Sequence, residues 1–314
     1  MIKLAQNKPL LEIKNLSVSF NMYQKLVEKQ NLEVISDLSI DVQAGQILAI
    51  VGSSGSGKSL LANAILGILP NHAIIKGKMS YKGKDLTAQY QEALRGKEMA
   101  LVPQSVSYLN PLMKVAQQVI GHTDKEKRKI GLKKVFKRLG LDEDVENMYP
   151  HQLSGGMARR VLVATAVIGD AQLIIADEPT PGMEVEQAVE ALKIFRQLAD
   201  EGKGIILITH DIDLALKVAD QIAIFYAGTI LEVATPQDFL QGEESLRHPY
   251  SKALYRAMPQ NDFTALVGLQ PYAGTISQGC LFAPRCAHCK VKCKENLPPM
   301  AEVRNGYVRC YDAT

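Results

Sequence analysis

The residues best suited to chemistry in this chain begin with a glycine-rich loop. Gly52-Ser-Ser-Gly-Ser-Gly-Lys58-Ser59 fits the phosphate-binding pattern G-x-x-x-x-G-K-[ST] at every fixed position. The glycines let backbone N–H groups turn toward phosphate, the Lys58 ammonium adds positive charge, and the Ser59 hydroxyl can ligate Mg²⁺. We therefore predict a nucleotide site that contains Gly52, Ser53, Ser54, Gly55, Ser56, Gly57, Lys58 and Ser59.

A pair of carboxylates follows a second buried strand. Leu173 to Ala176 is a short apolar run, and Asp177 and Glu178 come directly after it. Beside bound phosphates, Asp177 would orient Mg²⁺ through its water shell. Glu178 would polarise an attacking water molecule as a general base.

A third motif, Leu153-Ser-Gly-Gly-Met157, opens the apolar helical run from Val161 to Ile168. A helix N-terminus with small residues offers unpaired backbone N–H groups to an anion. Ser154, Gly155 and Gly156 therefore predict a second phosphate contact, remote in sequence from the first.

Strands and helices in a regular order position these motifs. The apolar strand Gln46 to Val51 leads into the phosphate loop, and the helical pattern Ser59 to Leu69 follows it, which is the context that the motif requires. Further buried strands are expected at Met99 to Val102 and Gly204 to Thr209, and the helical stretch Val185 to Ala199 separates the later strands. This alternation favours an α/β fold with a parallel sheet.

Other segments predict additions to this core. Leu10 to Phe20 and Leu32 to Val42 alternate apolar and polar residues, as antiparallel strands do, and Ile222 to Tyr226 and Thr229 to Ala234 flank the turn Ala227-Gly228 as a hairpin.

The domain boundaries follow from changes in pattern. The segment at about 107–169 is helical and more charged, with an amphipathic stretch from Lys125 to Leu139, and we expect it to be an inserted helical subdomain. After about Leu246 the composition turns to Pro, Cys and basic residues. We therefore expect a nucleotide-binding domain at 1–245 and an extension at 246–314.

Charge and hydropathy exclude some function classes. The net charge is +3, with basic and acidic residues interspersed, so we expect no nucleic-acid partner. The longest apolar stretches are strand-sized, far below the roughly 20 residues of a membrane-spanning helix. The N-terminus from Met1 to Pro9 lacks the apolar core of a signal peptide, and we expect a cytoplasmic chain.

In this order and company, the three motifs resemble those of ABC transporter ATPases. The resemblance implies a P-loop NTPase cassette with a RecA-like core, an antiparallel β-subdomain and an inserted helical subdomain. It also implies ATP and Mg²⁺ as cofactors, and that Ser154, Gly155 and Gly156 cap ATP held by the phosphate loop of another subunit.

The resemblance assigns three further roles. Gln104, after a buried strand, matches the glutamine that senses Mg²⁺ and the γ-phosphate and faces the transmembrane subunit. His210 matches the histidine that contacts the γ-phosphate and the catalytic water. Phe20 stands where the family stacks an aromatic ring on adenine. The implied magnesium site contains Ser59, Gln104 and Asp177.

Two residues depart from the family pattern. Glu184 stands where an aspartate is usual, and Arg159 stands where the signature helix usually has glutamine. Neither change removes a catalytic group, so we expect the ATP bound by Lys58 to be hydrolysed. Whether both composite sites hydrolyse ATP is left open.

The C-terminal extension resembles the tail of oligopeptide, dipeptide and nickel importer ATPase subunits. The match lies in Arg247 to Leu254 and in the cysteines, all five of which fall between Cys280 and Cys310. The family associates four such cysteines with a [4Fe–4S] cluster, and four thiolates also suit zinc. Cys289 leaves the ligand set ambiguous by one residue; the matching set is Cys280, Cys286, Cys293 and Cys310.

The expected function is therefore the motor of an ABC importer at the cytoplasmic face of the cell membrane. The resemblance implies a heterodimer with a homologous second ATPase, two membrane-spanning permease subunits and an extracellular solute-binding protein. Peptides are the expected cargo, with nickel or another chelated metal as the alternative. A soluble ABC ATPase of translation or DNA repair is the alternative of another class; such chains usually carry two cassettes or a long coiled-coil insertion, which are absent here.

Overall fold

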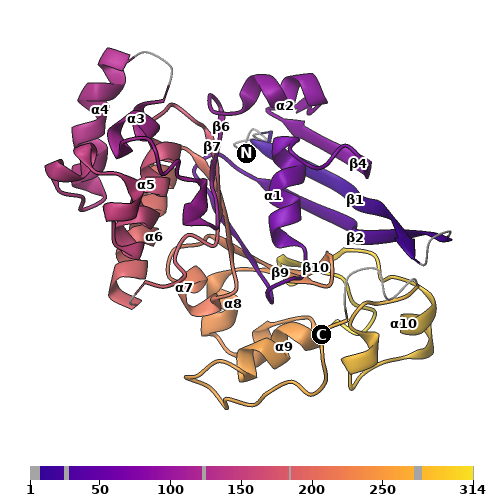
Figure 1. Cartoon of the computed structure of the whole chain (residues 1–314). Helices are drawn as coiled ribbons and strands as arrows, with labels where there is room; N and C mark the ends of the chain where they lie inside the picture. The colour runs from indigo at the N-terminus through magenta and orange to yellow at the C-terminus, as the bar shows by residue number, and fades with distance from the viewer. Residues whose placement is uncertain (1–7, 25–27, 122–124, 184, 272–277, 314) are drawn as a thin grey trace, which may run out of the picture.

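The computed structural model describes residues 8–24, 28–121, 125–183, 185–271 and 278–313. The strands of these residues form one sheet of eight strands and one of four. Figure 1 shows the helices of the middle of the chain gathered on one side of the large sheet, with the smaller sheet on the other side. The C-terminal segment lies below both sheets in this view.

The large sheet has the order β11-β12-β10-β9-β3-β8-β7-β6. The run from β9 to β6 is parallel, and β10, β12 and β11 continue the sheet antiparallel. The apolar runs predicted as buried strands all form strands of this sheet. The bounds are β3 (Ile47–Val51), β6 (Met99–Val102), β7 (Leu173–Asp177), β8 (Gly204–Thr209), β9 (Gln221–Tyr226), β10 (Thr229–Ala234), β11 (Ala301–Val303) and β12 (Gly306–Val308).

Each central strand contributes to two hydrophobic cores, because successive side chains point to opposite faces of a sheet. In β3, Ile47 and Ala49 face the core that includes the helices of the middle of the chain. Leu48 and Ile50 face the core beneath the smaller sheet. Burial on both faces explains why these strands are continuously apolar in sequence.

The smaller sheet is antiparallel, with the order β2-β1-β4-β5. The two predicted strands pair as expected, but β1 (Leu11–Gln24) and β2 (Glu28–Val42) are longer than the predicted 10–20 and 32–42. Pairing continues past the predicted strand ends, from Phe20 opposite Leu32 to Gln24 opposite Glu28, because backbone hydrogen bonds do not require alternating apolar and polar side chains. Strands β4 (Ala73–Tyr81) and β5 (Lys84–Asp85) were not predicted.

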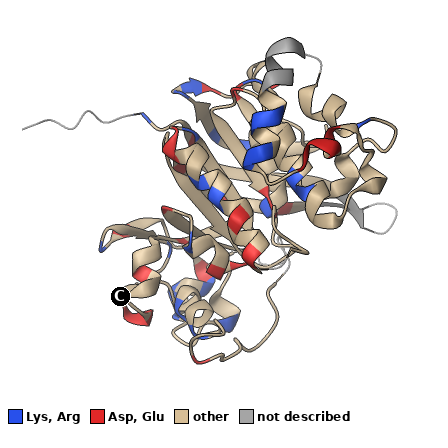
Figure 2. Ribbon diagram, turned by 90° about the vertical axis from the view of Figure 1, so that its left-hand side faces the viewer, with Lys and Arg blue, Asp and Glu red and all other residues tan. Residues whose placement is uncertain are grey.

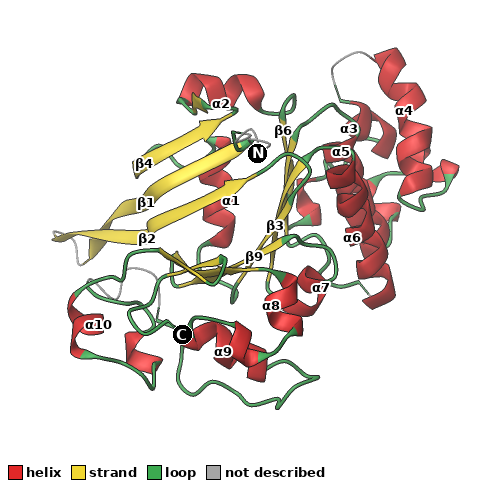
Figure 3. Ribbon diagram, turned by 180° about the vertical axis from the view of Figure 1, so that it is seen from behind, coloured by secondary structure: helices red, strands yellow, loops and turns green. Residues whose placement is uncertain are grey.

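Helices cover both faces of the large sheet (Figure 3). Helix α1 lies between the two sheets, and its apolar residues belong to the same hydrophobic core as those of β1 and β2. The α-helices are α1 (Lys58–Leu66), α2 (Ala88–Leu94), α3 (Val115–Ile120), α4 (Lys125–Arg138), α5 (Gly155–Val167), α6 (Val185–Asp200), α7 (Ile212–Leu216), α8 (Pro236–Leu240), α9 (Pro249–Arg256) and α10 (Val291–Glu295). Short 3₁₀ helices occur at Val106–Tyr108, Glu143–Asn147, Pro150–Gln152, Glu243–Ser245 and Ala283–Arg285.

A buried ion pair ties the C-terminal segment to the large sheet. Glu232 on β10 is 0% exposed, and its carboxylate accepts hydrogen bonds from the backbone amides of Arg247 and His248 and from the Arg247 guanidinium. The guanidinium also donates to the carbonyl oxygens of Val303 and Arg304, each at 2.6 Å. A Cβ atom at Gly306 would lie 2.5 Å from the Arg247 guanidinium carbon, so a side chain here would displace the guanidinium from these hydrogen bonds.

A second arginine ties the same segment to the smaller sheet. Arg309 is buried, and its guanidinium donates to the carboxylate of Asp37 at 2.9 Å and to the Asp37 carbonyl oxygen at 2.7 Å. Asp37 belongs to β2, so the C-terminal segment contacts both sheets through buried or half-buried polar groups.

The described residues include no helix that is both long and apolar enough to cross a membrane. Lysine, arginine, aspartate and glutamate are interspersed along the ribbon and are not separated into regions of one sign (Figure 2).

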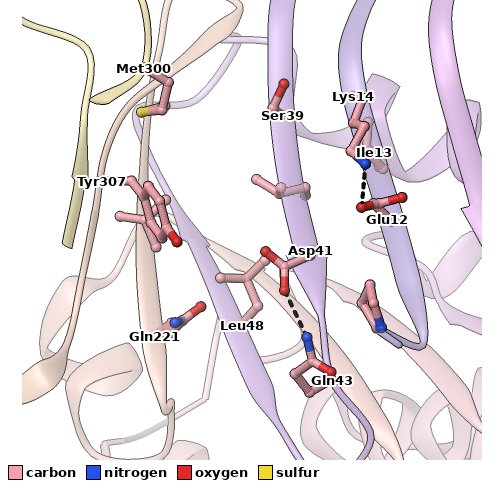
Figure 4. A pocket seen from close by; sticks show the side chains of 13 residues that line it. Glu12, Ile13, Lys14, Ser39, Asp41, Gln43, Leu48, Gln221, Met300 and Tyr307 are labelled. Carbon is pink, nitrogen blue, oxygen red and sulfur yellow. Dashed lines mark hydrogen bonds and ion pairs between the residues drawn. The ribbon is translucent and has the colours of Figure 1, made fainter. Parts of the chain in front are cut away.

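A cavity of about 440 Å³ lies where the two sheets diverge. Figure 4 shows Met300 and Tyr307 on one wall and residues of β1 and β2, including Glu12 and Asp41, on the other. None of the three sequence motifs lines this cavity.

The buried His248 predicts a stability change in mild acid. Its ring is 1% exposed, Nδ1 accepts a hydrogen bond from the Tyr250 amide, and burial lowers the pKa of His248 to about 3. Because the unfolded chain then binds more protons, stability falls as the pH drops below about 6.5, by at most about 1.4 kcal/mol per pH unit. We expect His248→Asn, which keeps an acceptor but cannot titrate, to flatten the plot of melting temperature against pH between 7 and 5.

The exposed His151 supplies the matched control. His151→Asn should leave the pH dependence of the melting temperature as in the unmodified chain. If His248→Asn leaves the slope of melting temperature against pH unchanged, burial of His248 is not the cause of the loss of stability in mild acid.

Candidate functional site

The parallel pairing of four strands gathers two of the three sequence motifs, the phosphate loop and the acidic pair, at one edge of the large sheet. In β3 and β8, Val51 lies opposite Thr209; in β7 and β8, Asp177 lies opposite Ile208. The carboxyl ends of parallel strands meet at the same sheet edge, which is where ligands bind in open α/β folds. The residues that follow these strands, including Gly52, Glu178 and His210, therefore lie along one line.

Two backbone hydrogen bonds from the end of β8 fix this alignment. The carbonyl oxygen of Thr209 accepts from the amide of Gly52, the first residue of the phosphate loop, at 3.3 Å. The carbonyl oxygen of Ile208 accepts from the amide of Glu178 at 2.9 Å. One strand thus positions the start of the phosphate loop and the acidic pair together.

A cavity of about 250 Å³ opens at this edge. It brings together residues of the phosphate loop, the acidic pair and Gln104, which follows β6. Leu60 lines the cavity too, although no pattern in the sequence had singled it out. The lining is Ser54, Gly55, Gly57, Lys58, Ser59, Leu60, Gln104, Asp177 and Glu178.

The phosphate loop is closed around its own lysine. Gly57 has φ +109°, a left-handed conformation that glycine adopts without strain, and it precedes α1. The Lys58 ammonium donates to the carbonyl oxygens of Gly52 and Ser53 at 2.7 and 2.8 Å. Burial lowers the pKa of Lys58, while the nearby Glu178 and Asp177 carboxylates act to raise it. A buried cation is thus held beside the place that phosphate oxygens would occupy.

Asp177 has the features of a magnesium-binding carboxylate. Its side chain hydrogen-bonds to Ser59, and its Oδ1 atom is buried with no hydrogen-bond partner in the described part of the chain. Burial raises the pKa of Asp177, and the Ser59 hydrogen bond lowers it. A buried carboxylate oxygen and a hydroxyl at one site suit Mg²⁺, which prefers oxygen ligands and brings waters of its own.

Glu178 and His210 form a direct pair. The Nδ1 atom of His210 lies 2.9 Å from both carboxylate oxygens of Glu178. An ionised carboxylate only accepts hydrogen bonds, so Nδ1 carries the hydrogen in this contact. The pairing holds the Glu178 carboxylate beside the cavity, as a general base requires.

The Glu178 backbone is strained. Its φ is +48°, in the left-handed region that disfavours residues other than glycine. The surrounding contacts must therefore hold the backbone of the candidate base in this conformation.

The signature motif lies outside this cavity. Ser154 caps the N-terminus of α5, and its hydroxyl accepts a hydrogen bond from the Met157 amide at 3.3 Å. Ser154 and Gly155 are exposed, and neither lines the cavity of its own chain. The α5 N-terminus is thus accessible to a ligand held by another molecule.

Phe20 also lies away from the cavity lining. It sits within β1, four residues before the strand ends, and its ring contacts His72 edge-on at a centroid distance of 5.5 Å. Its role toward adenine stays a prediction. Glu184 lies outside the described residues.

Sequence reasoning missed a contact between the phosphate loop and the C-terminal segment. The Ser53 hydroxyl donates to the Gln270 side-chain oxygen at 2.5 Å. The two residues lie 217 positions apart, and no local pattern marks Gln270 as part of a site.

Five free cysteines gather in the extension, with Cys280 and Cys293 buried. The pKa of Cys280 is raised to about 11, mainly by burial and in smaller part by the neighbouring thiols of Cys310 and Cys293. Burial also raises the pKa of Cys286 and Cys310. Nevertheless, no group of three or more His, Cys, Asp or Glu side chains in the described ranges could hold a metal ion as placed.

Known proteins share both parts of this chain. A family model described as "ABC transporter" matches residues 35–181, and one described as "Oligopeptide/dipeptide transporter, C-terminal region" matches residues 231–293. The dipeptide transport ATP-binding protein of Bacillus subtilis (strain 168) is 32% identical, covering 92% of this chain and 90% of its own length. The chain belongs to the ABC transporter family.

Other ABC transporter proteins agree. The oligopeptide transport ATP-binding protein OppD of Bacillus subtilis (strain 168) is 33% identical over 94% of this chain and 86% of its own. The dimeric structure of a bacterial ABC transporter cassette matches with a TM-score of 0.64 at 24% identity, over 72% of this chain and 98% of the other. A cassette of the cbiONQ complex from Clostridium perfringens matches with a TM-score of 0.62 at 23% identity, over 78% and 98%.

These likenesses establish the α/β cassette fold predicted from the sequence. As an ABC transporter ATP-binding protein, the chain is an ATP-hydrolysing subunit of a transporter. The predicted cysteine cluster is not tested by them.

The position of Glu178 predicts separable effects on binding and turnover. Glu178→Gln removes the base but keeps the side chain's size, so ATP binding should persist while the hydrolysis rate falls by roughly 10²–10⁴-fold. Nucleotide affinity and steady-state phosphate release would be measured on the same preparation.

Glu190→Gln is the control, because Glu190 lies on α6, is exposed and pairs only with Lys193 among the ion pairs of the described residues. It should keep the unmodified rate. Turnover that survives Glu178→Gln would remove Glu178 from the reaction.

Proposed function

We propose that this chain is the ATP-hydrolysing motor subunit of an importer that takes up peptides across the cell membrane. The observation that carries the proposal is its likeness to dipeptide and oligopeptide transport ATP-binding proteins over more than 90% of its length, including the C-terminal region. A likeness confined to the cassette would leave the cargo class open, because cassettes serve many transporters.

The proposed nucleotide site uses the residues gathered at the sheet edge. The phosphate loop and Lys58 would hold the phosphates of ATP, while Ser59, Asp177 and Gln104 would hold Mg²⁺, which neutralises phosphate charge when bound. Glu178 would take a proton from the attacking water, with His210 holding its carboxylate. Phe20 would stack on adenine.

A second ATPase subunit completes the proposed site. The exposed N-terminus of α5, with Ser154, Gly155 and Gly156, would contact ATP held by the phosphate loop of a homologous partner in a heterodimer. ATP would favour the closed pair because it contacts both subunits in that state only. Hydrolysis would then release them.

The proposed membrane partners are two permease subunits at the cytoplasmic face, supplied by an extracellular solute-binding protein. Support comes from apolar side chains that are exposed just after Gln104: Val106 is 40%, Tyr108 72% and Leu112 85% exposed. Such a group is typical of a surface that a partner covers. Gln104 would connect this surface to the nucleotide site.

The cargo class is testable with the assembled transporter. In the complex purified from membranes, we expect solute-binding protein loaded with peptide to raise ATP turnover at least about threefold over the ligand-free protein. The Glu178→Gln complex serves as the background. If a nickel chelate raises ATP turnover and peptide does not, the cargo is a chelated metal and the peptide proposal is wrong.

A different outcome would favour a soluble ATPase. If no permease subunit co-purifies and neither ligand changes turnover, the transport proposal is wrong.

We further propose that residues 1–245 form the ATPase domain, with its helical subdomain at about 107–169, and that residues 246–314 form a separate extension. In this extension a [4Fe–4S] cluster, or zinc in the alternative, would be held by Cys280, Cys286, Cys293 and Cys310. The proximity of these thiols supports the proposal: Cys310 and Cys293 each raise the pKa of Cys280, and Cys286 raises the pKa of Cys310. The Cys289 thiol likewise raises the pKa of Cys286. The thiols would have to move closer together to bind a metal, because no three of them are placed to share one ion.

Cysteine substitution tests the ligand set. Cys293→Ser should abolish iron or zinc measured in anaerobically purified protein, together with any visible absorbance of a cluster. Cys289→Ser, in the same segment, should keep both. Equal metal content in the two variants, or none in the unmodified protein, would contradict the cluster.

A further inference from the structure

Arg159 connects the signature helix to two backbone sites of the nucleotide pocket. It lies on α5, about one helical turn after Gly155. Its Nη1 atom donates to the carbonyl oxygen of Gln104 and, at 3.4 Å, to that of Glu178. One side chain thus links α5 to the ends of both β6 and β7.

The Glu178 contact falls on the strained part of the site. With φ at +48°, the Glu178 backbone needs restraint from both sides. The Ile208 carbonyl oxygen holds its amide, and the Arg159 guanidinium reaches its carbonyl oxygen. The carboxylate is in turn paired with His210.

The charge of Arg159 suits this position. The side chain is half-buried; burial lowers the pKa of the Arg159 guanidinium, while the Glu178 carboxylate raises it. A guanidinium is cationic at any physiological pH, and the two hydrogens on its Nη1 atom can each go to one of the two carbonyl oxygens. A glutamine side chain also ends in an NH₂ group, but it is shorter and carries no charge.

We propose that Arg159 is a positioning residue that transmits displacement of the signature helix to Glu178 and Gln104 of the same chain. Ser154 and Gly155 lie at the N-terminus of α5, about one helical turn before Arg159. A displacement of this N-terminus would therefore move the Arg159 guanidinium and the two carbonyl oxygens that it binds. The source of this displacement rests on the proposed function, in which Ser154 and Gly155 contact nucleotide on a second ATPase. The link between Arg159 and Glu178 within the chain does not depend on it.

The neighbouring arginine provides a matched control. Arg160 lies on the same helix, but its guanidinium donates to the carbonyl oxygens of Leu139 at 3.2 Å, Gly140 at 2.6 Å and, more weakly at 3.4 Å, Gly156 of its own helix. Removing it takes the same charge from the same helix without touching the contacts to Gln104 or Glu178.

The test compares Arg159→Met, Arg159→Lys and Arg160→Met in the assembled complex. Arg159→Met should lower kcat about tenfold with little change in KM for ATP, and Arg159→Lys should recover a substantial part of kcat. Arg160→Met should keep kcat within about twofold, even if it lowers the melting temperature. Equal kcat in Arg159→Met and the unmodified complex, or an equal loss in Arg160→Met, would overturn the proposal.

Hydrogen exchange gives a readout that does not depend on turnover. Backbone amides in residues 173–183 and 101–108 should exchange faster in Arg159→Met than in Arg160→Met, because only the former frees both carbonyl oxygens. Equal exchange in the two variants would also overturn the proposal. If the unmodified complex hydrolyses no ATP, the proposed function fails, while exchange still decides the role of Arg159.

Discussion

The position of β8 between β3 and β7 is the constraint on which the nucleotide site depends. Strand β8 pairs with both neighbours through parallel ladders of backbone hydrogen bonds. Its last two carbonyl oxygens accept from the amides of Gly52 and Glu178, which fixes both residues relative to the end of β8. A shift of one residue in either ladder would turn alternate side chains to the opposite face and separate the phosphate loop from the carboxylates. Buried apolar side chains on both faces of β8 oppose such a shift.

The sequence predicted the parts of the fold whose signals are local. The apolar strands, the glycine loop and the hairpin at Ala227-Gly228 each occupy a few consecutive residues, and the structure confirms them. Ala227 and Gly228 both have positive φ, as a tight hairpin turn requires. By contrast, β4 is mostly exposed, and β11 and β12 are three residues each, so none has a periodicity that distinguishes it from a loop.

The candidate site divides in the same way. The identities of Lys58, Asp177 and Glu178 follow from motifs, but their interactions depend on tertiary contacts that no motif encodes. The closing of the loop carbonyl oxygens on Lys58 and the hydrogen bond of Ser53 to Gln270 are of this kind. Arg159 was evident in the sequence only as a departure, and its contacts give that departure a physical meaning.

The pairing of Glu232 with Arg247 bears on the order in which the chain can fold during synthesis. The carboxylate of Glu232 is fully buried, but the amides and guanidinium that satisfy it come later in the chain. Arg247 in turn needs the carbonyl oxygens of Val303 and Arg304. On the ribosome, β10 therefore cannot complete its native environment until the last strands have emerged, so the large sheet finishes folding late.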